Sequence, residues 1–276
     1  SPRNFLHVGN ILYFSAQDND HGRELWRTDG TEAGTYLVKD IADGTYSSNI
    51  SSLSESNGRL IFNAFSLESG EEPWLSDGTE AGTVLMANIG ENTSSNAISN
   101  FVLFNNQLFF PAQNETVGGE LWVTDGTVNG THLFQDFFPG EDGTHPRDLV
   151  VMDDSLYFSG NHPTYETRLW RSDGTVGGTQ VISTSGSSPG NFLPLNGTLF
   201  FSAGDNSTGV ELWKSDGTLM GTTIVKDIYP GSNPSSPNSL IEFNGVLYFA
   251  ATDSSLNNEL WRSDGTEAGT ELVKDI

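Results

Sequence analysis

Short runs of apolar residues, each ending in an aromatic residue, recur six times along the chain. Residues 11–14 and 246–249 form two such runs, and both are too short for a helix and rich in strand-forming side chains. Because consecutive positions are apolar, we expect both faces of each strand to be buried, as in a sheet that lies between two other sheets. The aromatic residues that close the six runs are Phe14, Phe62, Phe110, Phe158, Phe201 and Phe249.

A polar two-residue segment precedes each run, and a tryptophan follows each aromatic residue by 12 positions. Pairs such as Asn57-Gly58 and Asn244-Gly245 tolerate the positive φ angles of a type I′ turn, so each repeat is expected to begin with a β-hairpin. The tryptophans recur at intervals of 48, 48, 48, 43 and 48 residues, as Trp26, Trp74, Trp122, Trp170, Trp213 and Trp261.

An Asp-Gly turn follows each tryptophan strand, and a fourth strand returns, as at residues 36–41 in the first repeat. A fixed period of this length with strand patterns and no helical pattern is typical of a β-propeller. We therefore expect an all-β fold: a single six-bladed β-propeller over residues 1–276, with four antiparallel strands in each blade. The predicted blades are residues 1–41, 50–89, 98–137, 146–184, 189–228 and 237–276.

Both ends of the chain fall in phase with the repeat, so the first repeat begins at its first strand and the sixth ends at its fourth. No terminal strand is then left over to complete the sheet of another repeat. We expect the ring to close by packing of the sixth blade on the first, without strand exchange.

The charge narrows the range of partners. The formal net charge is −24, from 36 Asp and Glu against 12 Lys and Arg, which disfavours nucleic acid and anionic membrane surfaces. A divalent cation, a cationic partner or a neutral glycan remains open. The chain has no cysteine, so it has no disulfide framework, and it contains no apolar run long enough to insert into a membrane.

The repeated motif, Glu-Leu-Trp-x-x-Asp-Gly-Thr followed by Gly-Thr, resembles the ELWxxDGT repeat, also called hyalin-like, of bacterial secreted and surface proteins. The second and fourth repeats depart from it, with Glu72-Pro73-Trp74 and Arg168-Leu169-Trp170. This resemblance implies an extracellular, cell-surface location, with adhesion, display or structural roles and no defined activity. Asp-Gly-Thr is complete in all six repeats, starting at Asp29, Asp77, Asp125, Asp173, Asp216 and Asp264.

Both recurring residues of the motif have a structural interpretation. Tryptophans in strands are more often core than ligand-stacking platforms, so we expect the six to pack between blades. The six aspartates are expected to cap backbone N–H groups in Asx turns, because one carboxylate per turn falls short of the six to eight oxygens that calcium takes.

Calcium (Ca²⁺) is the one cofactor that the sequence suggests. Its candidate ligands are pairs of acidic side chains near the loop between the second and third strands of a repeat. In three repeats an aspartate stands six residues before the motif glutamate, and the first repeat adds another aspartate; a plain hairpin loop is the alternative. The candidate ligands are Asp18, Asp20 and Glu24, Asp205 and Glu211, and Asp253 and Glu259.

A second candidate cluster lies on the first strands. His7, Glu55 and Glu242 occupy the same position in repeats one, two and six, which are neighbours in a closed ring. Two carboxylates and an imidazole near the channel could bind a metal or perform acid–base chemistry, whereas solvated channel-lining residues are the alternative.

The sequence offers no catalytic triad, phosphate loop or thiol, and we expect no enzyme. The favoured function is a non-catalytic extracellular module, structural or adhesive, of a larger surface protein, possessing a protein or glycan partner at the cell surface. The alternatives are a lectin-like, glycan-binding propeller and a channel-centred metal-dependent hydrolase.

Overall fold

A computed structural model describes residues 1–90, 98, 100–140, 142–183, 185–255 and 257–275. Every regular element in these ranges is a β-strand, and none of the described residues belongs to a helix suited to crossing a membrane. The chain divides into two compact units, Ser1–His145 and Pro146–Ile276.

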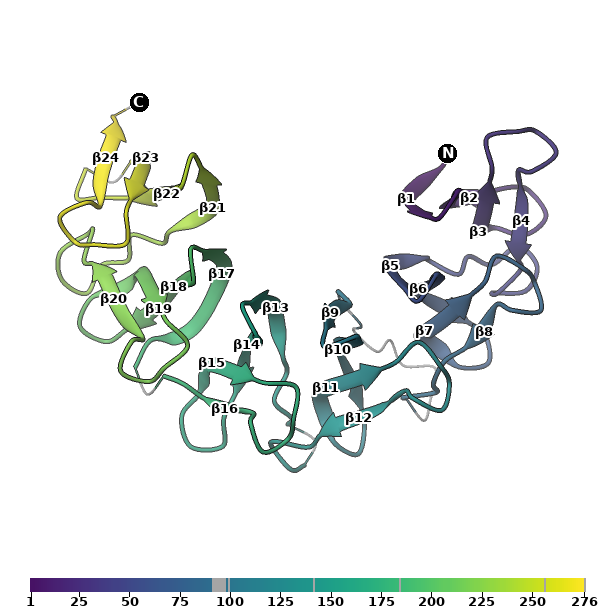
Figure 1. Cartoon of the computed structure of the whole chain (residues 1–276), viewed down its shortest axis with the longest axis horizontal. Helices are drawn as coiled ribbons and strands as arrows, with labels where there is room; N and C mark the ends of the chain where they lie inside the picture. Colours follow the sequence, from purple (N-terminus) through teal and green to yellow (C-terminus); the bar gives the residue numbers. More distant parts are fainter. Residues whose placement is uncertain (91–97, 99, 141, 184, 256, 276) are drawn as a thin grey trace. The chain divides into compact units, whose positions relative to one another are not determined.

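The first unit holds three four-stranded sheets, each with its strands in chain order (Figure 1). We call each sheet a blade and its first strand the inner strand. The strands are β1 (Arg3–Val8), β2 (Ile11–Gln17), β3 (Arg23–Thr28) and β4 (Tyr36–Lys39) in blade 1; β5 (Ser51–Ser56), β6 (Arg59–Ser66), β7 (Gly70–Ser76) and β8 (Val84–Leu85) in blade 2; and β9 (Val102–Phe104), β10 (Gln107–Asn114), β11 (Gly118–Thr124) and β12 (His132–Gln135) in blade 3.

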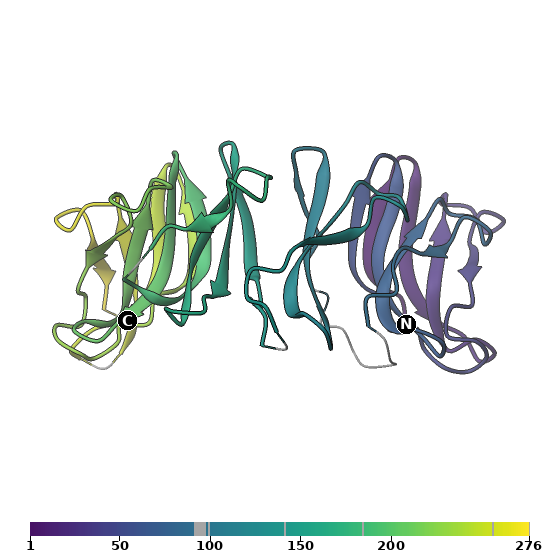
Figure 2. The ribbon, with the colours of Figure 1, turned by 90° about the horizontal axis from the view of Figure 1, so that it is seen from below.

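The second unit holds three more blades of the same kind, and Figure 2 shows the turns and loops of the blades at the two ends of their strands. The strands are β13 (Arg147–Met152), β14 (Ser155–Asn161), β15 (Thr167–Ser172) and β16 (Gln180–Val181) in blade 4; β17 (Ser187–Leu195), β18 (Thr198–Asp205), β19 (Gly209–Ser215) and β20 (Thr223–Lys226) in blade 5; and β21 (Asn238–Phe243), β22 (Val246–Thr252), β23 (Asn258–Ser263) and β24 (Glu271–Lys274) in blade 6.

Local sequence explains these elements. The hairpin turn of blade 2 has φ angles of 52° at Asn57 and 75° at Gly58, the positive values that a type I′ turn needs. The 12-residue spacing places each aromatic residue directly opposite its tryptophan, as Phe14 opposite Trp26 in the pairing of β2 with β3. The prediction of an all-β fold with four antiparallel strands in each of six blades is therefore confirmed, and the blades are those of a β-propeller.

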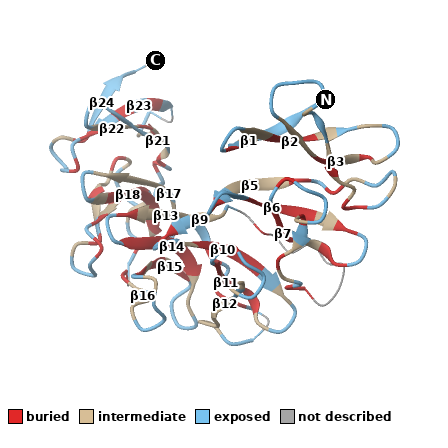
Figure 3. Ribbon diagram, turned by 45° about the vertical axis from the view of Figure 1, so that its right-hand side comes forward, coloured by how far each residue is buried: buried red, intermediate tan, exposed pale blue. Residues whose placement is uncertain are grey.

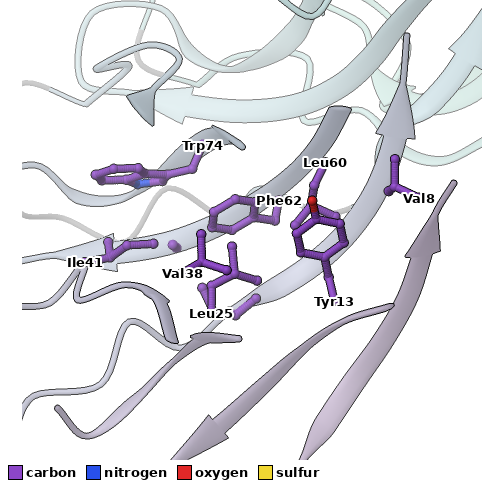
Figure 4. Packing of buried hydrophobic residues seen from close by; sticks show 10 residues of the cluster. Val8, Tyr13, Leu25, Val38, Ile41, Leu60, Phe62 and Trp74 are labelled. Carbon is purple, nitrogen blue, oxygen red and sulfur yellow. The ribbon is translucent and has the colours of Figure 1, made fainter. Parts of the chain in front are cut away.

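The core lies between neighbouring blades, where one face of a sheet packs on the next. Tyr13, Leu25 and Val38 of blade 1 pack against Phe62 and Trp74 of blade 2 (Figure 4). Figure 3 shows the buried residues gathered on the middle strands of the blades. Full burial of a side chain such as Phe62 contributes about 1.5–3 kcal/mol, so each interface is a hydrophobic core in its own right.

The second unit repeats this packing at the same positions. Tyr157 and Leu169 of blade 4 pack with Phe201 and Trp213 of blade 5, and Leu212 of blade 5 belongs to the next cluster, which includes blade 6. The prediction of one domain concerns how the two units combine, and it stays a prediction. The predicted ends of blades 4 and 6, residues 184 and 276, lie outside the described residues.

Candidate functional site

The inner strands of the second unit each carry a β-bulge at the same place. Pairing with the second strand skips from Arg147 to Val150 in β13, from Gly190 to Leu193 in β17 and from Asn238 to Ile241 in β21. Two residues in each strand therefore leave the hydrogen-bonded ladder.

A polar residue in the left-handed backbone region occupies the corresponding position of every blade, ten residues before the second-strand aromatic. Such a conformation costs of order 1–3 kcal/mol for a residue other than glycine, and it persists only where the surrounding structure imposes it. Asn and Asp tolerate it best. The six residues and their φ angles are Asn4 (52°), Ser52 (51°), Asn100 (37°), Asp148 (55°), Asn191 (57°) and Ser239 (55°).

A pocket of about 350 Å³ opens at the three bulges of the second unit. We call it the inner pocket. Its volume lies at the lower end of the range for small-molecule sites, and such sites combine an apolar lining with a few convergent polar groups. The lining residues are the bulge pairs Asp148 and Leu149, Asn191 and Phe192, and Ser239 and Leu240, together with Val150.

Hydrogen bonds hold two of the three polar side chains of the inner pocket. The Nδ2 atom of Asn191 donates to the Ser202 hydroxyl at 2.9 Å and to the Pro237 carbonyl of blade 6 at 3.5 Å. The Ser239 hydroxyl donates to Oδ1 of Asn238 at 3.1 Å. Each of these two side chains thus donates its hydrogen bond within the protein and keeps an oxygen atom that can accept a hydrogen bond from a ligand.

Asp148 is the charged group of the inner pocket. It is exposed, and a Cβ atom added at Gly190 would lie 3.2 Å from its Oδ2 atom, so the carboxylate reaches from blade 4 toward the backbone of blade 5. No basic residue lines the inner pocket. The arrangement can therefore accept hydrogen bonds and bind positive charge.

The motif glutamates that we considered as calcium ligands have another role. Glu24 is fully buried, and its carboxylate accepts hydrogen bonds from the backbone N–H groups of Ile41, Ala42 and Ser48 at 3.0, 3.3 and 3.1 Å. Glu211 does the same for Ile228 and Ser235. These carboxylates anchor the crossover to the next blade.

Burial raises the pKa of Glu24 and of Glu120, its counterpart in blade 3, to about 7, although hydrogen bonds from the crossover lower it in part. Burial also raises the pKa of Glu211. Glu259, in blade 6, is buried as well. An acid whose neutral form is favoured is a poor ligand for a divalent cation, so Glu24 and Glu211 do not fit the calcium hypothesis.

The loop aspartates cap their own turns. Asp18 accepts from the N–H groups of Asp20 and His21, and its Oδ2 atom lies 2.9 Å from Nδ1 of His21. Asp205 accepts from Ser207 and Thr208, and Asp253 accepts from Ser255. Over the described residues no three His, Asp or Glu side chains are grouped for a metal ion.

The channel candidates also have local partners. Glu55 accepts from the N–H of Gly58 at 2.7 Å, and Glu242 accepts from the N–H of Gly245 at 2.6 Å, so each carboxylate caps the hairpin of its own blade. His7 is exposed on β1. His7 and Glu55 belong to the first unit and Glu242 to the second.

The Asp-Gly-Thr turns are Asx turns. In blade 1, Oδ1 of Asp29 accepts from the backbone N–H of Thr31 at 2.9 Å and from its hydroxyl at 2.7 Å, and these bonds hold the pKa of Asp29 below its usual value. Thr31 in turn accepts from the N–H of Gly34. The aspartates therefore serve the turn.

The sequence analysis missed the residues of the inner pocket. The signal in the sequence was a small polar residue, Asn, Asp or Ser, that recurs ten positions before each aromatic residue. The bulge that turns this residue toward solvent is a property of strand pairing, so the pattern alone does not indicate a pocket.

Solved structures of similar fold include a puromycin-hydrolyzing peptidase from Mycobacterium tuberculosis, with a TM-score of 0.55 and 13% identity over 99% of this chain and 43% of that chain. A puromycin hydrolase matches with a TM-score of 0.55 and 13% identity over 99% of this chain and 54% of that chain. This chain thus spans about half the length of these proteins. Neither a protein-family model nor a curated protein matches it.

These likenesses overturn the expectation of a non-catalytic structural or adhesive module. These solved proteins are named for hydrolysis and not for adhesion, and at 13%, 13% and 14% identity the likeness shows the fold alone. The error has a physical cause. The motif repeats because every blade needs the same capped turn and the same anchored crossover, and this need is independent of what the protein binds.

Proposed function

We propose that this chain is the propeller part of a hydrolase, or the propeller partner of one, and that the inner pocket binds the substrate of that hydrolase. The chemistry of bond cleavage then resides outside the chain. The support is twofold: the fold is similar to about half of each puromycin-hydrolysing protein, and the inner pocket has the size and lining of a small-molecule site.

The observation that carries the proposal is the convergence of three bulges on one pocket. Asp148, Asn191 and Ser239 come from three blades, each in a backbone conformation that costs free energy. The strained polar residue recurs in every blade, but in blades 4, 5 and 6 three of them border one cavity, where their oxygens can meet a ligand.

Titration calorimetry with puromycin and with a short unblocked peptide tests this proposal. Leu149→Trp would fill the inner pocket, and we expect it to weaken binding by roughly tenfold or more. Phe5→Trp is the matched control, since Phe5 holds the same position on β1 in the first unit, and it should leave binding unchanged. Equal affinities of both variants, or no binding of either ligand to the wild-type chain, would refute the proposal.

We also propose that the six blades close into one ring by packing blade 6 on blade 1. Blade 6 has an uncovered face at the positions that blade 1 buries against blade 2. Exposure is 0% at Leu25 but 38% at Leu260, 3% at Val38 but 44% at Val273, and 9% at Val8 but 62% at Phe243. A large exposed apolar face usually marks a contact surface. The face of blade 6 corresponds to the one that blade 1 buries, so we expect another blade to cover it.

Blade 1 carries such a partner surface. Leu12 and Ala16 are half-buried, whereas their counterparts Leu60 and Ala64 in blade 2 are fully buried against blade 1. Closure would cover both surfaces without strand exchange. The family resemblance and the extracellular location stay predictions.

A further inference from the structure

The chemistry of the inner pocket indicates which group it receives. Three oxygen acceptors from three blades border it: the Asp148 carboxylate, the Asn191 side-chain carbonyl and the Ser239 hydroxyl. The donor groups of Asn191 and Ser239 already bond within the protein. The inner pocket therefore offers one negative charge and acceptors for several donors.

We propose that the inner pocket binds a primary ammonium group, specifically the α-ammonium end of a small peptide or aminoacyl compound. An ammonium carries three N–H donors and no acceptor, which complements three acceptors of which one is a carboxylate. A phosphate or carboxylate ligand would meet Asp148 with no cation to offset the repulsion. This inference rests on the proposed function only in taking the inner pocket as a ligand site.

The apolar lining limits what accompanies the ammonium group. Leu149, Phe192 and Leu240 are half-buried and surround the polar residues. A volume of about 350 Å³ lies at the lower end of the range for ligand sites, so it suits a small group. The ligand is therefore a short chain with an apolar side group next to its amine, and a long polyamine does not fit this description.

Asp148 distinguishes blade 4 from the other blades. The corresponding residues are Asn or Ser in the other five, and Asn stands at this position with nearly the same φ angle in Asn4 and Asn191. Asp148→Asn therefore removes the charge while it preserves a residue that the bulge accepts. Because Asn already adopts this backbone conformation in two other blades, we expect the variant to fold, and its NMR spectrum reports this.

The test measures binding of two compounds to the whole chain by NMR titration. The compounds are 2-phenylethylammonium and its neutral N-acetyl analogue. We expect the wild-type chain to bind the ammonium and not the acetylated compound, and Asp148→Asn to weaken ammonium binding by roughly tenfold. Rising salt should weaken binding to the wild type, because the pair is exposed.

Asp153→Asn is the matched control. Asp153 is also exposed, also has a positive φ of 51° and also belongs to blade 4, but it lies in the hairpin turn outside the inner pocket. Equal loss in both variants, or equal binding of the acetylated compound, would overturn the inference. Binding of puromycin that Leu149→Trp weakens and Asp148→Asn leaves unchanged would overturn the ammonium inference and leave the proposed function standing.

Discussion

At the scale of single residues, the buried motif glutamates tie the stability of the protein to pH. Glu24 and Glu120 have pKa values of about 7 in the folded protein, against 4.5 for an ordinary glutamate. Between pH 4.5 and about pH 7, these two glutamates therefore keep their protons in the folded state and lose them in the unfolded chain. Their contribution to stability is complete below pH 4.5 and is lost as the pH rises through about 7.

We expect the free energy of unfolding to fall between pH 5 and pH 8, as measured by urea unfolding. Glu24→Gln and Glu120→Gln keep an acceptor for the crossover but cannot ionise, so the double variant should show a smaller fall. His21, whose pKa is raised by Asp18, titrates in the same direction, and comparing variant with wild type removes its effect. Identical pH dependence of the two proteins would contradict the prediction.

Two adjacent glycines of the blade 4 turn differ sharply in their surroundings. A Cβ atom at Gly178 would lie 2.1 Å from Oδ1 of Asp173, whereas one at Gly177 would meet nothing within 4 Å. Gly178→Ala should lower the free energy of unfolding by about 1–3 kcal/mol through overpacking. Gly177→Ala should leave it unchanged or raise it by up to about 1 kcal/mol. Chemical denaturation of both variants measures the difference, and equal effects would count against the turn geometry.

At the scale of elements, a basic residue after the tryptophan links one blade to the turn of the next. Arg27 donates to the Gly78 carbonyl at 3.1 Å, Arg171 to the Gly217 carbonyl at 3.3 Å, and Lys214 to the Gly265 carbonyl at 2.7 Å. These bonds join third strands to neighbouring blades, so they fix the register between sheets as well as the spacing.

Lys214→Met should lower the free energy of unfolding by about 1.5–3 kcal/mol, the range for a hydrogen bond from a charged group. Arg262 occupies the same position in blade 6, but it is paired with Glu271 of its own blade and is exposed. While Arg262 stays paired with Glu271, Arg262→Met should lower the free energy of unfolding by much less than Lys214→Met does, because an exposed ion pair contributes little. A neutral effect of Lys214→Met would show that the link between blades contributes nothing.

At the scale of the whole molecule, closure of the ring has a measurable dimension. A compact chain of 276 residues has a radius of gyration of about 19 Å. We expect small-angle X-ray scattering of the monomer to give this value, and Leu260→Asp to increase it by placing a charge on the uncovered face of blade 6. A larger radius for the wild-type monomer, or a doubled mass from pairing of two copies, would contradict closure.

The sequence by itself determined the strands, the turns and the number of blades. Hairpin turns such as Asn57-Gly58 and the pairing of Phe14 with Trp26 depend on residues close together in the chain, so their pattern is readable without a structure. The role of the motif aspartates could also be predicted, because an Asx turn involves neighbouring residues only.

Only the tertiary structure decided the roles of the motif glutamates and the location of the inner pocket. Glu24 bonds with residues 17 to 24 positions away, and the inner pocket joins Asp148, Asn191 and Ser239 from three blades. A side chain on a strand can serve as a ligand, an anchor or a solvated group. Its role depends on which distant backbone groups lie next to it after the blades have packed. That information arises from the contacts between blades, whereas the repeat describes each blade alone.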